Sequence, residues 1–131
     1  MNVRAARNRR PIDAVWLVLA TLIAGSALAH HSATMFDRDR ARVVAGTVKE
    51  FQWTNPHAWL QVESADATGK PVEWSIEMGG INSLARSGYR PSTFKPGDSV
   101  SIYLAPHMDG VPAGLYIGAR LGDGTVLGKM P

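Results

Sequence analysis

The sequence predicts a mainly β fold, a small five-stranded antiparallel barrel with one short helix between its third and fourth strands. Apolar and polar residues alternate along most of the chain after residue 42, as they do in half-buried strands. Turn-forming residues separate the alternating segments, and one segment near residue 80 instead has helical spacing. Three strands, one helix and two strands are the order of an OB-like barrel, and another small antiparallel barrel or a sandwich is the alternative.

The beginning of the chain predicts an export signal. A start with four arginines is followed by an apolar stretch over residues 14–28, which is shorter than the roughly 20 residues that span a bilayer as a helix. Residues 27–29, Ala-Leu-Ala, fit the small-x-small pattern of a cleavage site. We therefore expect a signal helix over residues 1–29 that is cleaved, with no membrane segment left afterwards, and an uncleaved anchor is the alternative. A polar leader over residues 30–42 and the barrel domain over residues 43–131 follow.

Three strands are expected before the helix. Residues 43–51 are rich in β-branched side chains, and residues 58–64 alternate between apolar and polar positions. Residues 72–78 alternate most regularly, because every second residue is a large apolar one. The Asn-Pro pair at residues 55–56 and the polar loop over residues 66–71 supply the turns between these strands.

The second half of the barrel begins with the helix. Apolar residues at helical spacing predict a helix over residues 80–87, which Gly88 ends. Two further strands are expected over residues 99–104 and 115–121, with a short last strand over residues 125–128.

Composition excludes several classes of function. The chain has 131 residues and no cysteine, so disulfides, thiolate metal sites and cysteine nucleophiles are excluded. Four of the 14 basic and one of the 11 acidic residues lie in the predicted signal, so the remainder holds ten of each and predicts no nucleic-acid partner. The chain carries no phosphate-binding loop, dinucleotide motif or serine-nucleophile motif, and Glu73 and Glu77 are expected to face solvent. We therefore do not expect an enzyme, and catalysis would need a bound metal.

All four histidines lie after the predicted cleavage site, and they predict a metal site. In an OB-like barrel the loops after strands one and four are expected on one side, which would bring His57 and His107 together. Cleavage after Ala29 would give His30 a free amine with a pKa of roughly 7.7–8.0 beside its imidazole, and His31 adds another ring. Nitrogen ligands without thiolates suit Cu(II), and also Ni(II) or Zn(II).

Other roles are open for these residues. The two adjacent histidines can be a solvated chain start, His57 can hold a turn, and His107 can be a surface loop residue. A second hypothesis is a metal-free module that binds a protein, peptide or glycan through Trp53, Asn55 and Trp59. A third is a copper oxidase-type enzyme. We expect a monomer in each case.

The predicted mature chain combines several longer motifs, AHHSATMFD, GTVKEFQWTNPHAWLQV, VEWSIEM, LARSGYRPSTFKPGDSV and GLYIGARLGDGTVL. This combination resembles an uncharacterised family of small exported proteins from Gram-negative bacteria, classed as a domain of unknown function. The resemblance covers nearly the whole mature chain and implies export to the periplasm and a single β-rich domain, without an assigned activity. It places His30, His31 and His57 in shared motifs, whereas His107 lies outside them.

Overall fold

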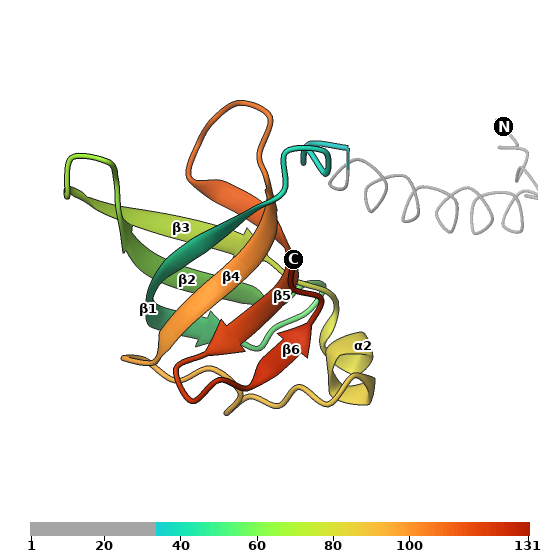
Figure 1. The fold of residues 1–131 in the computed structure, drawn as a ribbon. Coiled ribbons are helices and arrows are strands. Elements are labelled where there is room, and N and C mark those ends of the chain that lie inside the picture. The colour runs from blue at the N-terminus through green and yellow to red at the C-terminus, as the bar shows by residue number, and fades with distance from the viewer. Residues whose placement is uncertain (1–33) are drawn as a thin grey trace, which may run out of the picture. The chain divides into compact units, whose positions relative to one another are not determined.

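The computed structural model describes residues 34–131, and Figure 1 shows their arrangement. The predicted signal, together with His30 and His31, lies outside the described residues. The elements are β1 (Arg42–Gln52), β2 (Trp59–Ala65), β3 (Pro71–Glu77), α2 (Ile81–Arg86), β4 (Ser99–Pro106), β5 (Ala113–Leu121) and β6 (Val126–Gly128). Within residues 34–131, no helix is long and apolar enough to cross a membrane.

The strands form a closed ring in the order β3-β2-β1-β4-β5, and β6 pairs with β5 outside this ring (Figure 1). Neighbouring strands are antiparallel except β3 and β5, which close the ring in parallel between Ser75↔Ala113 and Glu77↔Leu115. One parallel pair is unavoidable, because alternating directions cannot return to their start around five strands. The predicted five-stranded barrel with a helix between strands three and four is confirmed, as a mixed rather than a wholly antiparallel ring.

β1 is the longest strand because its two partners lie along different halves of it. Its first half pairs with β4 and its second half with β2, and the two sets of pairs meet at Thr47. Gly46 lies at this crossing, where a Cβ atom would come 2.3 Å from the carbonyl oxygen of Glu63. Only a residue without a side chain allows the two strands to approach this closely. The second half of β1 then leads to the end of β3, since Gln52 pairs with Trp59, which in turn pairs with Glu77.

Alternate side chains of the strands fill the barrel, as the apolar pattern predicts. The inward positions of β2, β3 and β4 are buried, among them Leu60, Trp74, Ile76, Ile102 and Leu104. Such close-packed aliphatic and aromatic side chains supply most of the free energy that holds a small domain folded. The core therefore fixes the strand register on which the candidate site depends.

The segment after α2 is tied to β5 and β6 by two tyrosines. Gly88 ends the helix with φ of 92°, as predicted. The Tyr89 and Tyr116 hydroxyl oxygens lie 2.9 Å apart, and the Tyr116 hydroxyl also donates to the carbonyl oxygen of Leu127 at 3.4 Å. Burial raises the pKa of Tyr116 far above its ordinary value, so this phenol stays protonated and keeps its hydrogen bonds.

Candidate functional site

The loop between β1 and β2 is bound firmly to the end of β3. The Ala58 amide donates to the Gly79 carbonyl oxygen at 3.2 Å, and the Met78 amide donates back to Ala58 at 2.9 Å. Within the loop, the Thr54 hydroxyl donates to the carbonyl oxygen of His57 at 3.0 Å. These bonds hold the backbone of His57 over the last residues of β3.

The side chain of His57 lies on Glu77, the last residue of β3. Its Nδ1 atom is 2.5 Å from Oε1 of Glu77, and the two side chains are 32% and 8% exposed. The prediction that Glu73 and Glu77 both face solvent is confirmed for Glu73, which is exposed and pairs with Lys49, and is wrong for Glu77. Strand alternation does point Glu77 away from the barrel interior, but the loop that carries His57 covers this end of β3.

The contact with Glu77 defines the chemistry of the His57 ring. A nitrogen and a carboxylate oxygen this close must share a hydrogen, because two bare acceptors would repel each other. The hydrogen on Nδ1 leaves Nε2 of a neutral ring with its lone pair free of a proton. A carboxylate that fixes a histidine in this way is the usual support of a metal-binding imidazole.

His107 lies in a different setting, at the end of β4. Its ring meets Phe36 edge-on, with centroids 5.6 Å apart, and its side chain is 12% exposed. Here Nδ1 accepts a hydrogen bond from the Asp109 amide at 3.2 Å, with the carboxylate of Asp109 at 3.8 Å. Because Nδ1 is an acceptor, the proton of a neutral ring lies on Nε2, and the His107 ring is set up as a donor.

The expected convergence of His57 and His107 stays a prediction, and the two rings contact different residues, Glu77 and Phe36. The register places the end of β4 two strands from Glu77, since Ala105 pairs with Leu115, which in turn pairs with Glu77. In the described part of the chain, no three His, Asp or Glu side chains gather closely enough to hold a metal ion. A site that includes His30 and His31 stays a prediction, since both residues lie outside the described range.

The three residues predicted to bind a protein, peptide or glycan differ in their surroundings. Trp53 packs edge-on against Phe51, with centroids 5.7 Å apart, and joins the margin of the core. Trp59 is half-buried beside Glu77, and Asn55 is exposed in the loop before His57. A ligand-binding role of these three residues stays a prediction.

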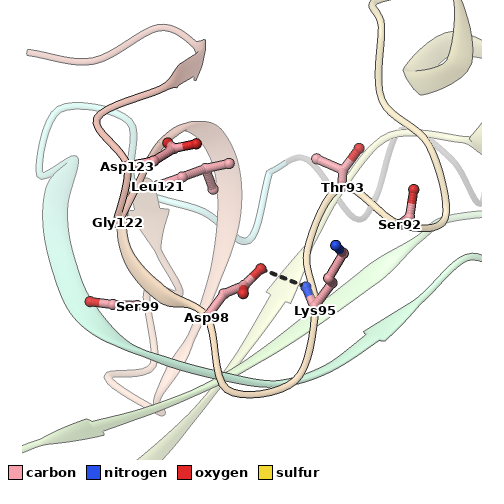
Figure 2. A pocket seen from close by; sticks show the side chains of 8 residues that line it. All are labelled: Ser92, Thr93, Lys95, Asp98, Ser99, Leu121, Gly122 and Asp123. Carbon is pink, nitrogen blue, oxygen red and sulfur yellow. Dashed lines mark hydrogen bonds between the residues drawn. The ribbon is translucent and has the colours of Figure 1, made fainter.

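Three hollows on the surface of residues 34–131 have linings that do not include His57. Figure 2 shows one of them, a polar hollow of about 320 Å³ between the segment before β4 and the β5–β6 turn. Its carboxylates hold their own turns: Asp98 accepts the Lys95 amide at 2.9 Å, and Asp123 accepts the Thr125 amide at 2.9 Å. The Thr125 amide also lowers the pKa of Asp123. We therefore assign this hollow to turn formation and take His57 with Glu77 as the candidate site.

The sequence identifies His57 as a candidate but misses Glu77. A period of two reports which face of a strand a residue occupies, and it carries no information about a loop that folds over that face. Only the register, in which Trp59 pairs with Glu77, shows that His57 comes within reach of this carboxylate.

Comparison with known proteins gives one match. A family model described as a family of unknown function (DUF6152) matches residues 18–116. No curated protein and no solved structure matches the chain. The comparisons therefore assign no activity.

Proposed function

Since the chain belongs to this family of unknown function, we propose its role from its own residues: an exported periplasmic protein that binds copper through His57, His30 and His31. The signal-like start of the sequence supports export, and the ring of His57 supports metal binding. The proposed role is carriage or homeostasis of the metal rather than turnover of a substrate.

The observation that carries this proposal is the contact between His57 and Glu77. The buried carboxylate holds the hydrogen of Nδ1, so the ring is oriented before any metal arrives and Nε2 is its ligand atom. The ring is still one-third exposed, which leaves room for an ion to approach.

The chain start is proposed to supply the other ligands. Cleavage after Ala29 would give His30 a terminal amine and an imidazole, which can chelate one ion, and His31 would add a third nitrogen. Together with Nε2 of His57 these are nitrogen ligands only, a set that favours Cu(II) over Mg²⁺ or Ca²⁺ and also accepts Ni(II) or Zn(II).

The direct test is a Cu(II) titration of the protein that begins at His30 beside the same protein with one extra residue in front. The extra residue removes the amine from the His30 chelate, so we expect much weaker binding. Mass spectrometry of the exported protein checks the cleavage site itself. Equal, weak binding by both proteins would exclude the amino-terminal site and favour the metal-free binding module.

A matched pair of variants tests the described half of the site. His57→Ala removes the proposed Nε2 ligand itself. Loss of a residue that only supports a ligand typically lowers metal affinity roughly 10- to 100-fold, so His57→Ala should lower Cu(II) affinity by more than that. His107→Ala removes a ring whose Nδ1 is already bonded and should leave the affinity unchanged. Equal losses in the two variants would contradict the assignment to His57.

A further inference from the structure

Two methionines face each other beside the β4–β5 loop. Phe36 and His107 form an isolated antiparallel bridge, and the Met108 amide donates to the carbonyl oxygen of Met35 at 2.9 Å. One step along this bridge, Met35 therefore lies directly opposite Met108. Both methionines lie in turns at the end of the bridge, and this hydrogen bond holds their backbones side by side.

Both methionine side chains are exposed. Met35 is 47% and Met108 is 64% exposed, whereas Phe36 and His107 turn their rings toward each other and are half-buried. The two methionine side chains therefore lie at the surface beside this bridge. The core does not use these side chains, in contrast to the buried Met78.

The chemistry of the pair points to a soft metal ion. Thioethers are neutral, polarisable ligands that select Cu(I) over harder divalent ions. Each methionine has three rotatable side-chain bonds, so two sulfur atoms on facing residues can turn toward one ion at little cost. Asp109 follows Met108 and its carboxylate is exposed, which supplies a negative charge near a monovalent cation.

We propose that Met35 and Met108 form a separate site for a soft monovalent ion, Cu(I) or its analogue Ag(I). The physiological use of this site for Cu(I) rests on the proposed copper function, whereas binding of Ag(I) does not depend on His57. The protein would then hold the two oxidation states of copper on different ligands, nitrogen for Cu(II) and sulfur for Cu(I).

The test measures oxidation of individual methionines by hydrogen peroxide with and without Ag(I), using the protein purified as cells process it. Exposed methionines are oxidised to sulfoxides, and a sulfur atom that binds metal is shielded. Ag(I) should slow the oxidation of Met35 and Met108 several-fold and to the same extent, at one ion per chain. Met78 serves as the internal control, since it is buried.

Variants show whether the two sulfur atoms share one ion. In Met108→Leu, which keeps the side-chain volume, Ag(I) should no longer protect Met35. Met130→Leu is the matched control and should keep the protection. Unchanged oxidation of Met35 in the presence of Ag(I), or full protection of Met35 in Met108→Leu, would overturn the proposal. In His57→Ala, Ag(I) should still protect Met35 and Met108, whereas Cu(II) affinity should fall. The experiment therefore distinguishes a failure of the methionine site from a failure of the histidine site.

Discussion

His57 and His107 are both loop histidines with partly buried rings, yet the partner of Nδ1 differs between them. In His57 this nitrogen faces the Glu77 carboxylate, which accepts a hydrogen, whereas in His107 it faces the Asp109 amide, which donates one. The same side chain is thereby left with a free lone pair at Nε2 in one loop and with a hydrogen in the other. The capacity of a histidine to bind a metal is thus decided at the nitrogen that does not touch the metal.

Among variants that keep His57, the largest expected effect on Cu(II) affinity comes from changing its partner. Glu77→Gln keeps the size of the side chain and removes its charge, so Nδ1 loses its strongest acceptor. We expect Cu(II) affinity to fall about 10- to 100-fold in a titration at constant pH, with circular dichroism unchanged. If the variant binds Cu(II) as tightly as the parent protein, Glu77 does not support the ligand and the comparison between the two loops fails.

The next effect is on stability, at the other histidine. His107→Ala removes the edge contact with Phe36 and leaves the Asp109 amide without its acceptor. The free energy of unfolding in urea should fall by about 1–2 kcal/mol, while Cu(II) affinity stays the same. If His107→Ala binds Cu(II) more weakly than the parent protein, the two loops belong to one site.

A smaller effect is expected from the loop that carries His57. Thr54→Val deletes the hydroxyl that donates to the carbonyl oxygen of His57 and keeps the side-chain shape. The free energy of unfolding should fall by about 0.5–1.5 kcal/mol, the contribution of one such hydrogen bond. Because the loop orients the ring, Cu(II) affinity should fall as well, and by less than in Glu77→Gln. An affinity that is unaffected would mean that the bonds from Ala58 and Met78 alone place His57.

The smallest effect is expected for the carboxylate near His107. Asp109→Asn leaves the amide bond to Nδ1 in place and removes a charge that is exposed to water. Neither the urea midpoint nor Cu(II) affinity should change measurably. Asp109→Asn makes at an exposed carboxylate the same change that Glu77→Gln makes at a buried one. If both variants changed Cu(II) affinity by a similar amount, burial of the carboxylate would not explain the effect of Glu77→Gln.

The local features of the fold follow from the sequence, whereas its closure does not. The alternation over residues 72–78 predicts β3, and Gly88 correctly ends the helix, because both signals act between neighbours in the chain. The pairing of Met35 with Met108 joins residues far apart in the sequence, and no local pattern encodes it. In the candidate site, the Asn-Pro-His motif predicts His57 from the sequence. Glu77 is identified only from the pairing of the strands and its contact with His57.

The parallel closure of the barrel has a consequence for how the site is assembled. β3 pairs with β5 from Ser75↔Ala113 to Glu77↔Leu115, so the pairing is short and Glu77 is its last residue on β3. These contacts join distant parts of the chain, so they are slow to form compared with the hairpin between β2 and β3. Because Glu77 orients His57, an ion bound at Nε2 of His57 would favour the closed ring by mass action, and opening of these β3–β5 pairs would release it.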